Sequence, residues 1–343
     1  MKFLKTLVVF IPFMMISCLE VETTSKVNRD GSIERNIRLK GSAENIKKTK
    51  FNIPRQDLAL WRITQDSLDE ENDQYQAIAR FESVEDLNQS FKRNTSDPGV
   101  EIISSLVLDE GFFFNRYYYQ ENIWADLPGP DLPMDTYLSQ AELEALIVSE
   151  TEPGGGALDT LEAARLEHQL DLYIEDVIYK DFVAQLREGG KRAGTLEIID
   201  EMFKEHSDSL SLALNSTDYS DENLVWMPIL EKYLDVTVID KIQQANAEGF
   251  TEFYASWKFF EEVLLNDYQF SVELPGVIRN TSALDVRGNR MNWEPSTIRL
   301  FFGGISLEAE SSVVKPWSLI ITGLLLLLTL AVTVAGYLRQ RSQ

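Results

Sequence analysis

The sequence predicts an α+β protein, with an antiparallel β-sheet domain that carries a large helical insertion and with one C-terminal transmembrane helix. Apolar and polar residues alternate in several stretches of 18–135 and of 267–316, as in half-buried strands. Residues 136–266 place apolar side chains at helical spacing, and residues 317–337 contain no charge. Because 267–316 is too short to bury a core alone, we expect both β segments to form one domain; two independent domains are the alternative.

Residues 1–17 have the layout of a signal peptide, with Lys2 and Lys5 before an apolar run and a small residue at its end. Cys18, the only cysteine of the chain, follows at once. The segment Met15–Cys18 resembles the lipobox of bacterial lipoproteins. This resemblance implies that residues 1–17 are removed and that Cys18 is acylated, with palmitate as a typical chain. An ordinary signal peptide with an incidental cysteine, or an uncleaved anchor, is the alternative.

The first β segment begins with a hairpin. Residues 19–27 and 33–40 each alternate in polarity, and the turn between them contains Asn28, Asp30 and Gly31. A short helix is expected at Val84–Phe91. The same alternation predicts further strands at Leu58–Ile63, Tyr75–Phe81, Glu101–Leu108 and Phe112–Tyr119.

The insertion opens with Ser139 and Glu142, which have the spacing of a capping box. Glycines at 154–156 and at Gly189–Gly190 are interpreted as flexible joints between helices. Helices are predicted at 158–186, 196–214, 222–234 and 238–265, and strands return at Phe270–Leu274, Met291–Trp293, Ile298–Phe302 and Ile305–Glu310.

The stretch 317–337 is long enough to cross the hydrocarbon core, and Trp317 and Tyr337 stand where interfacial aromatic residues belong. Arginines in the tail 338–343 favour a cytoplasmic C-terminus. We therefore expect a bacterial cytoplasmic-membrane protein, lipid-anchored and single-pass, whose main domain lies in the periplasm or at the cell surface. Since strand residues follow Cys18 directly and few residues separate Glu310 from the membrane helix, both anchors are expected at one end of the domain.

Charge excludes one class of partner. Without the signal peptide and the tail, 28 basic residues face 55 acidic ones, a net charge of −27. Such a chain is repelled by nucleic acid and by anionic headgroups, and no long Lys/Arg block is present. Nucleic-acid binding is therefore discarded.

No metal or cofactor site is expected. His168 and His206 lack the Glu of a Glu-x-x-His motif, and the acidic loop Asp69–Asp73 lacks the glycine and the final glutamate of a calcium loop. No catalytic residue is assigned. A carboxylate-based hydrolase is the less favoured alternative, because carboxylates are abundant but none is singled out by position.

The aromatic run from Phe112 to Tyr119 is the strongest candidate for a binding wall. Phe112, Phe114 and Tyr118 share one face of the predicted strand and would line a cavity for an apolar ligand. Core packing with partner contact is the alternative.

Short motifs carry a resemblance to a known family. Together with the lipobox and the C-terminal helix, Asn28, Asp30, Gly31, Leu274, Pro275, Gly276 and Trp293 resemble the LppM-like bacterial lipoprotein domain. The resemblance implies an envelope protein whose extracytoplasmic α+β domain is related to lipid-binding helix-grip folds. From the residues alone these positions are structural, because Leu-Pro-Gly ends a strand in a turn and Trp293 suits a core.

Two functions remain. The favoured one is a membrane-anchored module of the cell envelope that binds lipid or another apolar ligand. The alternative is a non-catalytic scaffold whose helical insertion docks an envelope protein.

Overall fold

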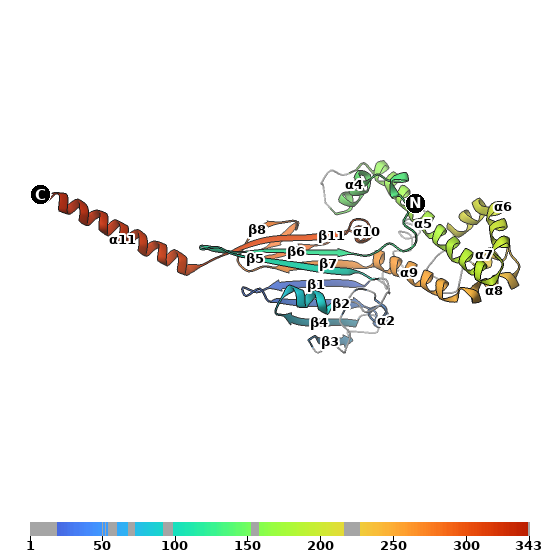
Figure 1. Cartoon of the computed structure of the whole chain (residues 1–343), viewed down its shortest axis with the longest axis horizontal. Coiled ribbons are helices and arrows are strands. Elements are labelled where there is room, and N and C mark those ends of the chain that lie inside the picture. The colour runs from blue at the N-terminus through green and yellow to red at the C-terminus, as the bar shows by residue number, and fades with distance from the viewer. Residues whose placement is uncertain are drawn as a thin grey trace.

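The computed structural model describes residues 19–49, 51, 53, 60–67, 73–91, 99–151, 158–215 and 227–341. It confirms the α+β class, with strands in the middle, helix α11 at one end and a group of helices at the other (Figure 1). The strands are β1 (Glu20–Val27), β2 (Ile33–Gly41), β3 (Arg62–Ser67), β4 (Asp73–Phe81), β5 (Glu101–Glu110), β6 (Phe114–Trp124), β7 (Asp267–Glu273), β8 (Val277–Thr281), β9 (Asp285–Arg287), β10 (Arg290–Trp293) and β11 (Ile305–Val314). The helices are α2 (Ala43–Lys48), α3 (Val84–Ser90), η1 (Met134–Thr136), α4 (Gln140–Thr151), α5 (Thr160–Ala193), α6 (Leu196–Asn215), α7 (Met227–Leu230), α8 (Val236–Ala245), α9 (Ala247–Leu265), α10 (Ile298–Phe301) and α11 (Pro316–Arg341).

The strands form two stacked sheets. Sheet A has the order β3-β4-β2-β1-β7-β10-β9, and sheet B has the order β5-β6-β11-β8. Two details differ from the sequence expectation, since there are two sheets and β1 pairs with β7 in parallel. The chain passes between the sheets several times, most directly where β7 leads into β8. The result is a β-sandwich, with its core between the sheets.

Alternation along the strands builds this core. On β2 the residues Ile33, Ile37 and Leu39 are buried, while Glu34 between them is exposed. On β6 the inner positions are Tyr117, Tyr119, Glu121 and Ile123. Because side chains in a strand alternate between faces, each sheet presents one apolar face to the other.

Three local predictions are wrong. Gly189 and Gly190 do not separate helices but lie buried inside α5, where a Cβ on Gly189 would come 2.7 Å from Ile242 Cγ2 of α8. These glycines therefore permit close helix packing. The expected helix 238–265 is two helices, broken at Asn246. The expected strand at Ile298–Phe302 is the helical turn α10, packed beneath the insertion.

Helix α11 is long and apolar enough to cross a membrane, by length and composition. The stretch Pro316–Ala335 has a mean hydropathy of 2.5, and almost none of it is buried against the rest of the chain. In Figure 1 it extends away from the sandwich as a single helix. A core helix would be covered by neighbours, so its exposure agrees with the span that the sequence predicts.

The expectation that both anchors lie at one end is wrong. The Leu19 backbone N donates to Asn266 Oδ1 (3.2 Å), beside the first residue of β7. Ser312 instead lies against Gly276, just beyond the last residue of β7. Seven residues of β7 separate these points, about 23 Å at ~3.3 Å per residue. The chain thus enters the sandwich at the helical end and leaves it at the opposite end.

Candidate functional site

The end of the sandwich next to α11 carries an exposed aromatic group, here called the aromatic tip: Phe112, Phe113, Phe114 and Trp317. The ring centroids of Phe112 and Trp317 lie 5.2 Å apart, and those of Phe112 and Phe113 lie 4.9 Å apart. Phe112 is 52% exposed and Trp317 is 48% exposed. The β5–β6 turn and the first turn of α11 therefore form one apolar surface.

The first group of motif residues, Asn28, Asp30 and Gly31, builds the β1–β2 turn at this same end. Gly31 has φ +84°, a left-handed conformation that favours glycine. Ser32 donates from its backbone N and its Oγ to Asp30 Oδ1, at 3.0 and 2.6 Å. The hydrogen bond from the Ser32 hydroxyl is the main cause of a lowered pKa of Asp30, and the bond from the Ser32 backbone N adds to it. The group shapes the turn between β1 and β2.

The second group, Leu274, Pro275 and Gly276, forms the crossing from sheet A to sheet B. Leu274 is buried, and the Pro275 carbonyl accepts a hydrogen bond from Ser311 Oγ at 2.9 Å. Gly276 has φ +89°, and a Cβ there would collide with the backbone carbonyl of Ser312. Trp293 lies elsewhere, partly buried on β10, and donates from Nε1 to Ser282 Oγ at 3.1 Å.

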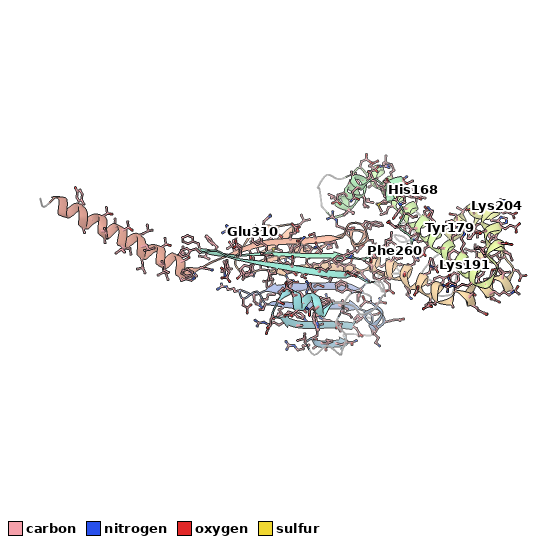
Figure 2. All side chains as sticks on the ribbon, viewed as in Figure 1. His168, Tyr179, Lys191, Lys204, Phe260 and Glu310 are labelled. Carbon is pink, nitrogen blue, oxygen red and sulfur yellow. The ribbon has the colours of Figure 1, made fainter. Side chains whose placement is uncertain are left out.

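The predicted wall residues Phe112, Phe114 and Tyr118 face outward. Phe112 and Phe114 belong to the aromatic tip, and Tyr118 lies on the outer face of sheet B. Tyr118 borders an open groove of about 430 Å³ with Val107, Glu308 and Glu310. Figure 2 shows Glu310 on the part of the sandwich nearer α11. The groove is half polar and carries two glutamates, so it does not have the chemistry of an acyl-chain pocket.

The interior of the sandwich holds a charged network. Arg35 of β2 and Glu121 of β6 form an ion pair with Nη2 and Oε2 2.5 Å apart, and their side chains are 0% and 1% exposed. Tyr119 donates its hydroxyl to Glu121, Ser104 Oγ donates to the same carboxylate at 2.9 Å, and Phe91 lies 5.7 Å from the guanidinium. Burial, the largest effect, raises the pKa of Glu121, but the Arg35 charge and the hydrogen bonds from Arg35, Tyr119 and Ser104 together hold this pKa below its ordinary value.

This network was not predicted, although the sequence carried a signal for it. Arg35 has the same strand parity as Ile33 and Ile37, and Glu121 has the same parity as Tyr119 and Ile123. A charge on the apolar face of each of two strands indicates a buried pair of opposite sign. Its members lie among the packed side chains of the core between the sheets.

A solved structure is similar. The folded domain of LppM from Mycobacterium tuberculosis, determined by NMR, aligns with 88% of this chain and 94% of its own length. The TM-score is 0.32 and the sequence identity is 10%. This is a member of the family that the motifs resemble, but at so low a TM-score the likeness establishes neither a common fold nor a common function. No protein-family profile matches the sequence, and no curated protein matches it significantly.

The helical region 136–266, here called the helical block, is fixed to the sandwich by an aromatic joint. Phe301 of α10 contacts Phe259 and Phe260 of α9, with ring centroids 6.1 and 4.7 Å apart. Tyr173 of α5 contacts Phe302 at 6.0 Å. Figure 2 shows Phe260 where the helices meet the strands. The block is thus packed onto the sandwich and not tethered by a linker.

Polar contacts inside the helical block hold α5 against α9 and against the start of the block. Tyr137 donates to Asp176 Oδ2 at 2.7 Å, and burial together with this hydrogen bond raises the pKa of Tyr137 to about 12. Trp257 Nε1 donates to Asp181 Oδ2 at 3.0 Å. Burial raises the pKa of Asp181, and the hydrogen bonds from Trp257 and Gln185 offset part of this rise.

Negative charge is concentrated in the helical block. Residues 136–266 contain 27 acidic and nine basic residues, a net charge of −18. Glu197, Glu201 and Glu205 are exposed and follow one another at four-residue spacing along α6. They therefore form one acidic face. In Figure 2, Lys191 and Lys204 mark the part of the block far from the strands.

The remaining predicted sites have simple outcomes. Cys18, most of the acidic loop Asp69–Asp73 and the glycines 154–156 lie outside the described residues. His206 packs its ring 4.9 Å from that of Tyr233. Within the part of the chain that the structure describes, no group of three or more His, Cys, Asp or Glu side chains is arranged to hold a metal ion.

Proposed function

We propose that this protein is a membrane-anchored adaptor of the bacterial envelope, whose acidic helical block binds a basic protein partner outside the cytoplasm. One observation carries this proposal: the helical block is packed directly onto one end of the β-sandwich, and α11 leaves the other end (Figure 1). The sandwich thus sets the separation between the start of α11 and the binding surface on the helical block.

The packed joint favours this role over a flexible tether. The joint buries Phe259, Phe260 and Phe301. Gly129, with φ +88°, lies in the loop between β6 and η1 and brings this loop against Val177 of α5 and Trp257 of α9. Because a partner bound to the block is then held at a fixed place relative to α11, the geometry suits docking or positioning.

Charge supports a basic partner. The block carries a net charge of −18, and its acidic face on α6 is exposed. Charged faces steer oppositely charged partners and speed their association in a salt-dependent way. Anionic headgroups would be repelled by the same face.

Binding of an apolar ligand inside the sandwich receives less support. The predicted wall residues face outward, and the Arg35–Glu121 network is part of the packed core between the sheets. We therefore place the contact with lipid outside the sandwich.

The test uses photo-crosslinking in the full-length protein in its native membrane. A benzoylphenylalanine at exposed Ser209 of α6 should crosslink a protein, and a probe at exposed Ser306 of β11 should not. The triple variant Glu197→Lys, Glu201→Lys and Glu205→Lys should abolish the crosslink. The matched variant Glu34→Lys, Glu85→Lys and Glu101→Lys, on exposed positions of the sandwich, should retain it. A crosslink that survives reversal of the acidic face, or that forms equally from Ser306, would contradict the proposal.

A further inference from the structure

We infer that the aromatic tip inserts into the interfacial layer of the same bilayer that α11 crosses, as a second membrane contact. This inference rests on the proposed membrane anchoring and adds a site to it. The occupant is the lipid surface itself, between headgroups and acyl chains.

Continuity with α11 fixes this occupant. Trp317 belongs to the first turn of α11, at the start of the apolar stretch, and its ring contacts Phe112. The Lys315 backbone N donates to the Phe113 carbonyl at 2.8 Å, which ties the β5–β6 turn to the beginning of the helix. A helix that crosses the bilayer from Pro316 therefore carries the turn to the level of the headgroups.

The chemistry of the tip matches that level. Phe112, Phe113, Phe114, Val314 and Trp317 are all exposed apolar side chains, with Phe112 the most exposed at 52%. Aromatic side chains are enriched where a protein meets the boundary between headgroups and acyl chains. A patch that joins a membrane helix is covered by lipid once that helix inserts.

Backbone hydrogen bonds allow the β5–β6 turn to lie in the interfacial layer of the bilayer. The Gly111 N–H donates to the Phe114 carbonyl at 2.9 Å, and Lys315 satisfies the carbonyl of Phe113. Polar backbone groups without partners are costly in lipid, so these bonds remove part of the penalty of insertion. Asp109 and Glu110 precede the tip on β5 and are exposed, which limits the insertion to the interface.

The consequence is a fixed orientation. A single helix lets a domain tilt about the hinge between β11 and α11, whereas a second contact beside the hinge restricts that tilt. The tip would therefore set how the sandwich, and the helical block packed on it, stand relative to the bilayer.

Depth measurement by spin labelling tests this directly. Because Cys18 is the only cysteine, the Cys18→Ala background gives unique labelling sites in the full-length chain. The label goes to Phe113→Cys, and the matched control is Val286→Cys, an exposed apolar position on β9. In phosphatidylcholine vesicles, the label at 113 should collide more with oxygen than with a water-soluble nickel chelate. The label at 286 should show the reverse.

Alkaline extraction distinguishes a failure of membrane anchoring from a failure of tip insertion alone. If the protein is washed from the vesicles, membrane anchoring fails and this inference fails with it. If the protein resists extraction and the label at 113 is as accessible to nickel as the label at 286, only the inserted tip is overturned. As a second readout, Phe112→Asp with Phe113→Asp should broaden the distances between a fluorophore at Lys204→Cys and labelled headgroups. Val286→Asp should not broaden them, and an unchanged distribution in the tip variant would also overturn the inference.

Discussion

Arg35 and Glu121 join the two sheets through an ion pair that is shielded from solvent on all sides, with side chains 0% and 1% exposed. A pair of this kind contributes little over apolar residues of the same volume, but removal of one partner leaves a buried charge. We predict that Glu121→Gln destabilises the protein by about 3–5 kcal/mol. Arg35→Met with Glu121→Leu should cost clearly less than the sum of the single changes, as measured by chemical unfolding of the detergent-solubilised chain.

The pH dependence provides the control for this prediction. The folded-state pKa of Glu121 lies below its ordinary value, so the carboxylate contributes stability above the unfolded pKa of about 4.3 and loses it as the pH falls through the folded pKa. The wild type should therefore lose stability in acid more steeply than the double variant. Equal slopes for the two proteins would show that the pair is not the coupled unit described here.

Asp181 presents the opposite case within the helical block. Its folded-state pKa is raised, mainly by burial, so its favourable contribution is present below the unfolded pKa of about 3.9 and is lost as the pH rises through the folded pKa. Asp181→Asn keeps an acceptor for Trp257 and removes the charge. We expect a higher Tm at neutral pH, with the gain vanishing in acid. Asp200→Asn, at an exposed position paired with Arg187 at 3.0 Å, should give no gain.

Alternation in the sequence predicts which residues of a strand share a face, but not which sheet that face meets. It groups Arg35 with Ile33 and Ile37, and the structure confirms that all three point inward. The partner Glu121 lies 86 residues away in the other sheet, a pairing that no local pattern encodes. Likewise, Tyr118 shares a face with Phe114 as predicted, but Tyr117 and Tyr119 take the inner face. Because β6 carries aromatic residues on both faces, composition could not decide which face turns toward the core.

The crossing between the sheets shows the same limit. Pro275 and Gly276 predict a turn, and a turn is found. That the turn leads into a different sheet depends on the contact of Gly276 with Ser312, which lies 36 residues later. Gly189 and Gly190 illustrate the converse error, because glycine in a helix permits close packing as readily as it marks a joint.

We predict that Gly189→Ala destabilises the helical block by about 1–3 kcal/mol. The new Cβ would lie 2.7 Å from Ile242 Cγ2 and 2.9 Å from the Ile242 backbone O, so α5 and α8 must separate. Gly190→Ala is the graded comparison, because its closest contact is the Ile199 side chain at 3.0 Å. Hydrogen exchange of α8 should rise more in Gly189→Ala than in Gly190→Ala, and equal exchange in both would contradict this reading of the packing.

The last prediction concerns Cys18, which lies outside the described residues. We expect mass spectrometry of the membrane-extracted protein to show an acylated N-terminus at Cys18. Cys18→Ala should lose the acyl group and remain in the membrane, because α11 holds the chain independently. An intact Met1 or a free thiol at Cys18 would contradict acylation.

The position of Leu19 adds a consequence for orientation. Leu19 is buried beside Asn266 at the helical end of the sandwich, whereas α11 begins at the other end. An acyl chain on the preceding residue and α11 can enter one bilayer only if the sandwich lies along its surface, which brings the helical block close to lipid. Energy transfer from a fluorophore at Lys204→Cys to labelled headgroups should then be stronger in the acylated protein than in Cys18→Ala. Equal transfer in both proteins, with acylation confirmed, would show that the two anchors do not share one bilayer in this way.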